Sequence, residues 1–471
     1  MSYRTAATED GQLLAHDIDI VSDAGAYPLL SGFVLLYITL NAAGPYRCDN
    51  VRVRARAAYT NNTPGSAFRG FGGMQPVLGY EAQIDKVADA AEPGPRGGPQ
   101  AQRLQDGRPD PRRTAHRDRR VAAAVHRRGD GGDRPPRPEP SSPEHRVGLG
   151  LACNVQPYGR VAWMNDSASA WVGCERDGGV VVRCGVPDVG GGQVSSLAQI
   201  AAEVLGVPIE NVTVHFGDSA RTPLAGRTTA TRQLYMSGNA VLSAARELRA
   251  QLVAGVAKAT GCAEHDLTLA EGGVLTPEGV VPLAEVVAMC LANGVAINAM
   301  KTYFAPTAKP VTQLIDSERI VPDFTFGAHA AYIEVDTRTG EVRPLRYVAA
   351  HDVGRAINPL SVRGQIEGAV VQGLGYALSE RIVYDEAVNL TGAFYQYAIP
   401  TAADCPEIEV KVLESGEGVG PFNARGIGEP PIGPCAATIA SAVEDAVGAR
   451  PTTLPMLAER VLKCVGEGGR A

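Results

Sequence analysis

Apolar and polar positions alternate along several stretches of the chain in the way that β-strands require. Two such runs flank the turn Glu9–Gly11, in which glycine permits positive φ, and they predict a hairpin over residues 3–27. Val51–Tyr59 alternates apolar residues with three arginines, which predicts a strand whose arginines form a solvated face. A further hairpin is predicted over 330–353, turning at Thr339–Gly340.

Other stretches carry apolar residues at helical spacing. Ser195 or Ser196 can cap the first of these helices, and Gly206 ends it. The predicted helix at 361–380 contains four glycines, each costing about 0.5–1 kcal/mol relative to alanine, so close packing or close ligand approach is expected there. The remaining helices are expected at 236–260, 283–293 and 435–447.

The segment 93–146 differs from the rest of the chain. It is dominated by Arg, Pro, Gly and Asp and contains a single leucine, so it cannot bury enough apolar surface to offset its ordering entropy. We expect this segment to be disordered. It could serve as an Arg-rich binding tail, but its acidic residues and prolines argue against a continuous basic patch. The explanation that we favour is a GC-rich gene read here in the wrong frame.

The chain of 471 residues is long enough for two or three domains. Strand hairpins and helices alternate irregularly, which predicts a mixed α/β fold of the α+β class. The change of composition at 93–146 divides the chain into 1–92, 93–146 and 147–471. Because residue 3 already lies in a predicted strand, we also expect that a segment upstream is missing.

Composition narrows the classes of function. The formal net charge is -7 and aromatic residues make up 6%, which argues against a nucleic-acid-binding protein. The nine cysteines are widely spaced without a CxxC motif, which favours reduced thiols over iron-sulfur or zinc sites. The chain shows neither a signal-peptide core nor an apolar run of membrane-spanning length, so a cytoplasmic protein with no membrane partner is expected.

The strongest candidate for chemistry is Glu429 in the sequence GIGEPPIGP (Gly426–Pro434). Two prolines stiffen the backbone after this acid, and Pro430 is expected to bias Glu429 away from the α region. An acid held in an apolar Gly/Pro turn is a candidate for a raised pKa and for proton transfer. The alternative is an exposed loop carboxylate, or a charge favoured by the N-terminus of the following helix.

Three further motifs suit a polar or anionic ligand. In SAFRGFGGMQ, glycines let the backbone approach a ligand, Arg69 supplies charge, and Phe71 supplies a flat wall. The turn Gly190–Gln193 enters a helix N-terminus, which is an anion site suited to a phosphate. Thr228–Gln233 (TTATRQ) offers more hydroxyls than an N-cap needs, so the others could face a cofactor.

These motifs, together with QIEGAVVQGLG (365–375), occur in the order and spacing of a known family. The chain resembles the molybdenum-binding large subunit of the xanthine dehydrogenase and aldehyde oxidase family. The resemblance implies that 1–92 is the C-terminal part of a first molybdenum-cofactor-binding domain and 147–471 a second. It implies a molybdopterin cofactor, in its simple or cytosine dinucleotide form, and partner subunits that carry [2Fe-2S] clusters and FAD.

The resemblance also implies roles for individual residues. Glu429 would be the general base, and Phe71 would stack on the substrate. Arg69 and Ala230 would lie beside the metal through their backbone. The residues implied to bind the cofactor are Phe68, Arg69, Gly70, Gly191, Gln193, Thr228, Thr229, Ala230, Thr231, Arg232, Gln233 and Gln365. No side chain is expected to ligate molybdenum directly.

This chain departs from the family pattern at two motifs. The family's GQG turn reads Gly190-Gly191-Gly192 here, with Gln193 displaced by two positions. The place of the substrate-orienting arginine of animal xanthine enzymes falls near Tyr37, which makes Tyr37 a candidate substrate contact. The family's upstream domain and its GGGFGG loop are not in this sequence.

Three functions are compatible with these observations. The first is a subunit that hydroxylates a small-molecule purine or other N-heterocycle with water and passes electrons to partner subunits, with an aldehyde or another aromatic substrate as the alternative. The second is an inactive, truncated remnant. The third is a glycine-rich binding or scaffolding protein without chemistry, which would require five motifs to coincide by chance.

Overall fold

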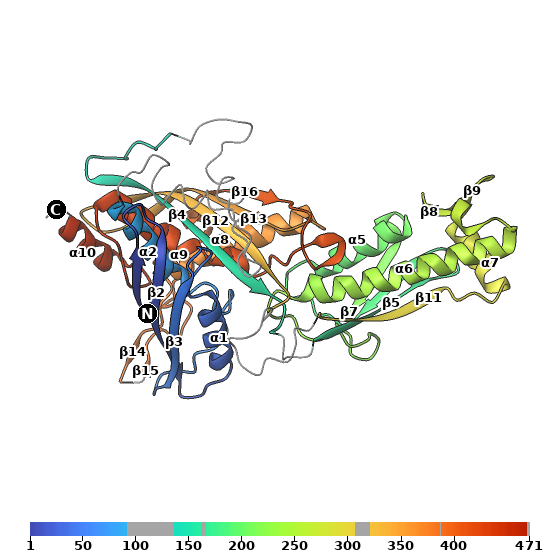
Figure 1. Cartoon of the computed structure of the whole chain (residues 1–471), viewed down its shortest axis with the longest axis horizontal. Helices are drawn as coiled ribbons and strands as arrows, with labels where there is room; N and C mark the ends of the chain where they lie inside the picture. The colour runs from blue at the N-terminus through green and yellow to red at the C-terminus, as the bar shows by residue number, and fades with distance from the viewer. Residues whose placement is uncertain (92–135, 162–165, 307–320, 387, 469–471) are drawn as a thin grey trace.

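The computed structural model of the chain describes residues 1–91, 136–161, 166–306, 321–386 and 388–468. Its elements form two lobes joined along the long axis of the molecule (Figure 1). We call residues 166–306 the small lobe and the other described residues the large lobe. None of the helices within the described ranges is long and apolar enough to cross a membrane. The predicted mixed α/β class is confirmed.

The large lobe is built on a four-stranded sheet in the order β16-β13-β12-β4. Helices α8 and α9 cover this sheet, and their apolar faces share one buried core with β12 and β13 (Figure 1). The strands are β4 (His145–Tyr158), β12 (Asp323–Asp336), β13 (Val342–Asp352) and β16 (Glu407–Leu413). The helices are α8 (Pro359–Leu378), α9 (Cys435–Val447) and α10 (Ala458–Gly468).

The N-terminal part of the large lobe is a three-stranded sheet in the order β1-β2-β3. Its elements are β1 (Ser2–Ala7), β2 (Leu13–Gly25), β3 (Asn50–Tyr59), α1 (Ser31–Asn41) and α2 (Val77–Ala90). The hairpin predicted over 3–27 is confirmed as the antiparallel pair β1 and β2. The arginines of β3 are exposed as predicted, and they pair with Asp17 and Asp19 on β2.

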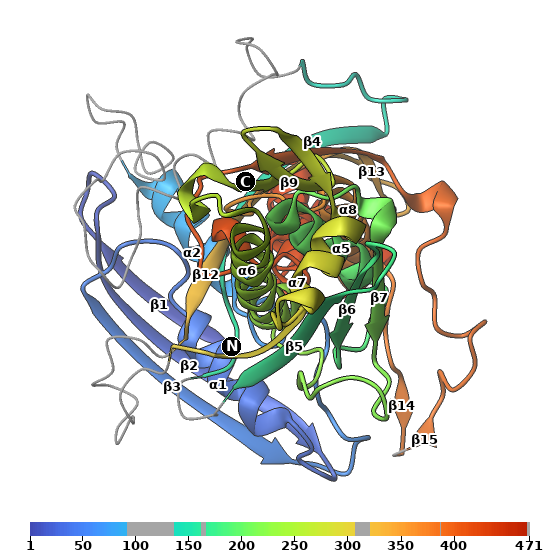
Figure 2. The ribbon, with the colours of Figure 1, turned by 90° about the vertical axis from the view of Figure 1, so that its right-hand side faces the viewer.

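The small lobe pairs a second four-stranded sheet, in the order β11-β5-β6-β7, with the long helix α6 and with α5 (Figure 2). Its core is a single apolar cluster between these two layers. The strands are β5 (Ser167–Cys174), β6 (Val180–Cys184), β7 (Val212–Phe216) and β11 (Asn298–Phe304). The helices are α5 (Gln193–Leu205), α6 (Gln233–Thr260) and α7 (Leu283–Ala292).

Short elements complete the described chain. They are β8 (Thr268–Ala270), β9 (Gly273–Thr276), β10 (Gly279–Pro282), β14 (Tyr384–Asp385), β15 (Val388–Asn389), η1 (Ile209–Asn211), η2 (Glu264–Asp266), η3 (Ala402–Asp404), η4 (Pro421–Asn423) and η5 (Pro430–Ile432). The second predicted hairpin is confirmed as β12 and β13.

The expectation of disorder over 93–146 is wrong at the C-terminal end of that segment. Residues 136–146 are described, and His145 and Arg146 pair with β12 as the first residues of β4. The Ser141 amide also donates to Glu334 on β12 at 2.7 Å, so tertiary bonds order this stretch despite its composition. Residues 93–135 lie outside the described ranges. The three-part division of the chain stays a prediction, although the described part of 147–471 contains two separate cores.

Candidate active site

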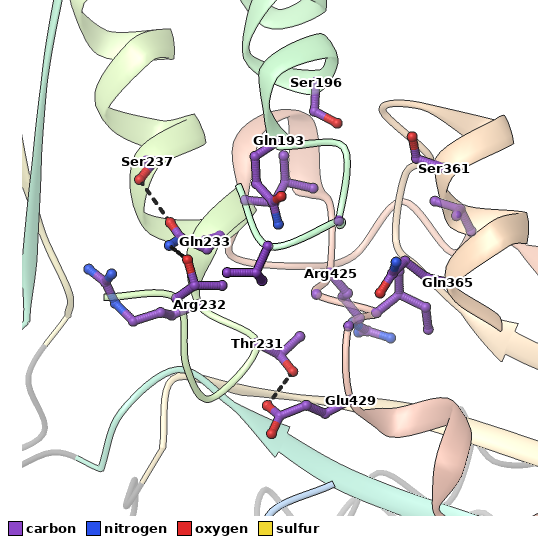
Figure 3. Close-up of a pocket in the computed structure, with 18 of the residues that line it drawn as sticks. Gln193, Ser196, Thr231, Arg232, Gln233, Ser237, Ser361, Gln365, Arg425 and Glu429 are labelled. Atoms are coloured by element: carbon purple, nitrogen blue, oxygen red, sulfur yellow. Dashed lines mark hydrogen bonds between the residues drawn. The ribbon is translucent and has the colours of Figure 1, made fainter. Parts of the chain in front are cut away.

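A cavity of about 520 Å³ lies between the two lobes and gathers most of the predicted site residues (Figure 3). The small lobe contributes residues from 186–197 and 228–237, and the large lobe contributes residues from 67–71, 353–365 and 425–429. Nearly 360 residues separate Arg69 from Glu429 in the sequence, yet both line this cavity. The fold therefore brings together motifs that the sequence could only place in order.

Side chains from other elements fix the loop that carries Glu429. Alternate carbonyl oxygens of this loop each accept a hydrogen bond from a side chain: Thr325 on β12 donates to Gly426 at 2.7 Å, Arg69 to Gly428 at 2.7 Å, and Asn154 on β4 to Pro430 at 2.9 Å. The start of the loop is anchored by Arg425, which is fully buried and forms ion pairs with Asp352 and, at 3.3 Å, with Asp323. The carboxylate is thus held on a backbone with little freedom.

The backbone of Glu429 differs from the prediction. Its φ is -108° and its ψ is -39°, in the right-handed helical region, although the following proline disfavours that region. The hydrogen bonds to the carbonyls of Gly428 and Pro430 hold the loop in this conformation. Glu429 is also the N-cap of the short helix η5, and its carbonyl oxygen accepts from the Ile432 amide at 3.3 Å. Tertiary bonds therefore override the local preference.

The Glu429 carboxylate faces the cavity and is otherwise surrounded by protein. Burial raises its pKa above the ordinary value for a glutamate, because the charged form loses hydration. Hydrogen bonds with Thr231 and the Gly70 amide and the charge of Arg69 act in the opposite direction. Thr231 Oγ1 donates to Glu429 Oε2 at 2.7 Å (Figure 3). A carboxylate with a raised pKa, aimed into a cavity, is suited to take up a proton.

Arg69 links the FRGFGG loop to the two large-lobe segments of the cavity. Its Nε donates to Gly428, and its Nη2 donates to the Gln365 carbonyl oxygen at 3.0 Å and to Gln365 Oε1 at 3.2 Å. Burial lowers the pKa of Arg69, and the charge of Glu429 opposes this shift. Gln365 therefore has part of its amide engaged by Arg69 while it lines the cavity.

The aromatic residues of this loop have different surroundings. Phe68 and Phe71 line the cavity, and Phe71 adopts a left-handed φ of 34°. The ring of Tyr37 packs edge-on against Phe71 at a centroid distance of 5.4 Å, and Tyr37 is 7% exposed. Tyr37 thus lies behind Phe71, and it is not among the described residues that line the cavity. The structure does not support a substrate contact by Tyr37.

The glycine turn leads directly into α5. The helix begins at Gln193, with Gly192 at its N-cap in a left-handed conformation with φ 73°, so neither Ser195 nor Ser196 is the cap. The Oε1 atom of Gln193 is buried and has no hydrogen-bond partner, although Gln193 lines the cavity. A buried acceptor without a partner costs about 1–3 kcal/mol, which a bound donor group would recover. Gly191 lies beside it in the lining.

The segment 228–233 combines ligand-facing and structural residues. Thr228, Thr229 and Thr231 line the cavity, whereas Ala230 is bonded through its carbonyl oxygen to the Gly159 amide at 2.8 Å. Arg232, a predicted cofactor-binding residue, also lines the cavity, but its guanidinium has partners within the protein. Its guanidinium is fully buried, pairs with Asp166 at 2.7 Å and donates to three backbone carbonyl oxygens, so it fixes the loop.

Gln233 is also turned toward its own segment. Its amide donates to the Thr228 hydroxyl, which donates in turn to the Pro187 carbonyl oxygen at 2.8 Å. Gln233 Oε1 accepts from Ser237 on α6 at 3.4 Å (Figure 3). Thr228 and Gln233 therefore hold the N-terminus of α6 against the segment that precedes the glycine turn.

Two residues that sequence reasoning missed lie on β4. Asn154 donates to Pro430, and Gln156 donates to the Gly70 carbonyl oxygen at 3.0 Å. Because they are two residues apart on one strand, their side chains share a face of the sheet. Both are buried, and together they connect the loop of Glu429 to the loop of Arg69. A pair of amides at alternating positions in an otherwise apolar strand was the available signal.

The sequence matches two family patterns, each described as a molybdopterin cofactor-binding domain. They cover residues 1–95 and 132–406, so the second covers more than half of the chain. The chain belongs to this family. Glu429 lies outside both matched ranges, so its place in the cavity is an observation independent of them. The resemblance to the large subunit of xanthine dehydrogenases and aldehyde oxidoreductases is confirmed.

Relatives of this molybdopterin-binding chain bear names that refer to several compounds. It is 29% identical over 476 residues to a probable xanthine dehydrogenase subunit of Bacillus subtilis, covering 100% of this chain and 62% of that protein. It is 28% identical to the nicotine 6-hydroxylase large subunit of Paenarthrobacter nicotinovorans, covering 98% and 59%. The structure of quinoline 2-oxidoreductase from Pseudomonas putida 86 superposes with a TM-score of 0.80 at 25% identity, covering 98% and 61%. The chain thus spans about three fifths of each of these proteins.

The residues of the cavity fit a molybdopterin cofactor. Its pterin and phosphate groups carry both donors and anionic oxygens. The unpartnered Gln193 Oε1 can accept from such donors, and the N-terminus of α5 favours anionic oxygens. The hydroxyls of Thr228 and Thr229 lie in the same lining.

Proposed function

We propose that this chain forms the cofactor-binding part of a molybdenum hydroxylase that adds oxygen from water to an electron-poor carbon of an N-heterocycle. Glu429 is the general base of this reaction. The observation that carries the proposal is the position of its carboxylate: desolvated, bonded to Thr231, and fixed at the wall of a cavity that fits the cofactor. Only a group held in this way can take a proton at a defined place.

The cavity residues have distinct tasks toward the cofactor. Gln193 and the glycine turn receive its polar groups, and Gln365 with the hydroxyls of Thr228 and Thr229 completes the lining. When it is bound, the cofactor supplies a redox-active molybdenum centre that takes two electrons from the substrate. Arg69 holds the Glu429 loop through Gly428 and keeps a positive charge near the carboxylate.

In this reaction Glu429 accepts the proton that water loses when the oxygen of that water is transferred to the substrate. Its raised pKa makes the carboxylate a stronger base than an exposed glutamate, so it takes this proton more readily. Phe68 and Phe71 supply the apolar wall against which a flat ring can lie.

We propose an N-heterocycle as substrate, of the purine type first and of the quinoline or pyridine type next. Three of the similar proteins bear names that include xanthine, nicotine and quinoline, all of them N-heterocycles. The two phenylalanines of the lining suit such planar rings. An aldehyde remains the alternative substrate class for this family.

We propose that the cofactor is the cytosine dinucleotide form. A second hollow of about 490 Å³ shares Arg355 and Ile357 with the cavity and runs along α5 past Gln199 and Glu203. Such a groove gives room for a nucleotide beyond the pterin, and Arg355 at the junction can pair with a phosphate. Acid hydrolysis of the purified protein tests this form. Cytidine monophosphate in equal amount to molybdenum supports it, and molybdenum without the nucleotide contradicts it.

Electrons leave the site through partners. We propose that subunits with [2Fe-2S] clusters and FAD accept them, because the nine cysteines are scattered along the sequence without the close spacing of an iron-sulfur site. Two of the similar proteins are themselves named as subunits, and one of these is a large subunit.

The decisive experiment for this function uses water labelled with heavy oxygen. The chain is produced with the genes beside its own, purified, and supplied with xanthine, quinoline, nicotine and an aromatic aldehyde in turn. A product that carries the heavy oxygen, formed by the wild type and not by Glu429→Gln with equal molybdenum content, supports the proposal. Loaded protein that converts none of these compounds, or an unaffected Glu429→Gln variant, contradicts it.

A further inference from the structure

Thr231 makes a side-chain hydrogen bond with the carboxylate of Glu429. Its hydroxyl donates to Oε2 at 2.7 Å, from the small lobe across to the large lobe (Figure 3). The family resemblance places Thr231 among the residues that hold the cofactor. The observed hydrogen bond instead gives its hydroxyl a partner within the protein.

The backbone of Thr231 is strained. Its φ is 52° and that of Ala230 is 50°, both in the left-handed region that residues other than glycine rarely adopt. The region is least favourable for β-branched side chains such as threonine. Strain of about 1–3 kcal/mol per residue persists only where the surroundings impose it, and it clusters at functional sites.

Contacts on both sides of Thr231 impose this conformation. The preceding residue is held by the bond from the Gly159 amide to the Ala230 carbonyl oxygen at 2.8 Å. The following residue, Arg232, is fixed by Asp166. On the opposite side lies Gly426, where a Cβ atom would come within 2.4 Å of Thr231 Cγ2. The threonine is thus clamped between its neighbours and the Glu429 loop.

We propose that Thr231 is the positioning residue of Glu429: it fixes one carboxylate oxygen so that the base points at the reacting atoms. This inference rests on the proposed function, because it deepens the role of the same site. The hydroxyl cannot serve the cofactor as a donor while it donates to Glu429. The strained backbone is the cost of bringing this hydroxyl to that oxygen.

Other titratable groups face this pair from three elements. Arg69 of the FRGFGG loop favours the charged form of Glu429, and Tyr37 on α1 interacts electrostatically with the same carboxylate. Cys435 at the start of α9 interacts electrostatically with Arg69. Arg69 does not replace the hydrogen bond from Thr231, because its Nε donates to the Gly428 carbonyl oxygen and its Nη2 to the Gln365 carbonyl oxygen. Among the groups that lower the pKa of Glu429, the Thr231 side chain has the largest effect, through its hydrogen bond.

The test compares Thr231→Val with Thr231→Ser. Valine has the shape of threonine without the hydroxyl, and serine keeps the hydroxyl without the methyl group. We expect the valine variant to keep its molybdenum content and its KM within about twofold, and to lose roughly tenfold to a hundredfold in kcat, the effect of a lost hydrogen bond to a charged group. Serine should restore most of the kcat.

The pH dependence gives a second readout. Without the donated hydrogen bond the carboxylate is less stable, so the pKa of Glu429 rises and the base becomes protonated at a higher pH. The acid limb of kcat/KM should move upward by about one pH unit in Thr231→Val and return in Thr231→Ser. A residue that only stabilised the fold would lower activity without moving this limb.

A third readout does not depend on turnover. The carboxyl infrared band of Glu429, identified as the difference between wild type and Glu429→Gln, is titrated in the purified protein. Its midpoint should rise in Thr231→Val. If it does so while no substrate is converted by any variant, the proposed function fails and the positioning role stands. If it does not move while the wild type is active, the positioning role is wrong.

Two other results would overturn the proposal. Loss of molybdenum from Thr231→Val, with a wild-type pH profile in the remaining loaded protein, would assign Thr231 to the cofactor. Unchanged kcat and midpoint would show that the hydrogen bond has no effect. If the valine variant does not fold, Thr231→Ala gives the same comparison with serine, because alanine lacks the branched Cβ that disfavours a positive φ.

Discussion

Two glycine-rich segments line the same cavity, and two glycines of the Glu429 loop have closer neighbours than the first glycine of the turn before α5. In the Glu429 loop a Cβ atom on Gly426 would lie 2.4 Å from Thr231, and one on Gly433 would lie 2.3 Å from the Asn154 amide. In the turn before α5, a Cβ atom on Gly190 would meet nothing within 4 Å, and Gly190 has φ 98°. Gly426 and Gly433 are thus packed against the protein, whereas Gly190 presents open backbone.

The difference separates two uses of glycine in one site. The glycines of the Glu429 loop allow side chains from β4 and from 228–233 to approach closely and fix the base. Gly190 and Gly192 adopt left-handed conformations, and the buried acceptor Gln193 Oε1 at the end of this turn has no hydrogen-bond partner in the described chain. We infer that the first loop is preorganised for proton transfer and that the second acquires its contacts from the cofactor.

The largest effect is expected at Glu429 in the packed loop. Glu429→Gln removes the base and keeps the shape of the side chain, so turnover should fall by about 10²–10⁴ while cofactor content is retained. Steady-state kinetics on protein of known molybdenum content measures this. The matched control is Glu407→Gln at an exposed position on β16. Turnover within about twofold of wild type in Glu429→Gln would exclude Glu429 as the general base.

The packing of the same loop gives the next effect. Gly426→Ala places a methyl group against Thr231, which should lower the free energy of unfolding by about 1–3 kcal/mol. Gly428→Ala is the control, because its Cβ atom would lie 3.8 Å from the nearest atom, at ordinary contact distance. Denaturant unfolding compares the two. Equal stability of the two variants would mean that the loop is not closely packed.

A buried histidine pair on β12 and β13 lies against the start of α9, directly after this loop, and it predicts a pH dependence. His329 and His351 bond through their Nε2 atoms at 2.8 Å, and His329 Nδ1 approaches Cys435 Sγ at 3.7 Å. Burial lowers the pKa of His329 and lowers that of His351 to about 3.

Because the pKa is lower in the folded state than in the unfolded chain, the unfolded chain binds more protons below about pH 6.5. Stability should therefore fall with acidification from that pH, by about 1 kcal/mol for each histidine near pH 5.5. Urea unfolding across this range measures it, with the exposed His265→Gln as control. A flat profile in the wild type would contradict neutral burial of the pair.

The smallest effect is expected at the open turn. Gln193→Ala removes an acceptor that has no partner in the protein, so the stability of the cofactor-free chain should not fall. Cofactor retention should fall roughly fivefold, the effect of about one hydrogen bond. Molybdenum content after dialysis measures retention, with the exposed Gln12→Ala as control. A destabilised but fully loaded variant would place Gln193 with the packed loop instead.

The sequence was sufficient where local pattern decides the structure. The β1 and β2 hairpin, the exposed arginines of β3 and the helix after Glu429 follow from alternation, turn residues and helical spacing. The sequence also named four residues that the structure brings together in the lining of one cavity, Arg69, Gln193, Gln365 and Glu429, and their roles stay predictions. Their motifs carry unusual combinations of glycine with a charged or amide residue.

Features that depend on contacts between distant elements were not predictable in this way. Asn154 and Gln156 act only because β4 lies beneath two loops. Arg232 belongs to a motif that was predicted to face the cofactor, but its guanidinium pairs with Asp166 inside the protein. The left-handed backbone at Ala230 and Thr231 contradicts local preference and exists only through tertiary contacts.

The most direct test of cofactor binding in this cavity is the molybdenum content of the purified chain, measured by elemental mass spectrometry after production with the genes beside its own. We predict close to one molybdenum per chain in the wild type and in Glu429→Gln, and a lower content in Gln193→Ala. Molybdenum absent from the wild type, although a full-length relative produced in the same cells is loaded, would contradict the claim that this cavity holds the cofactor.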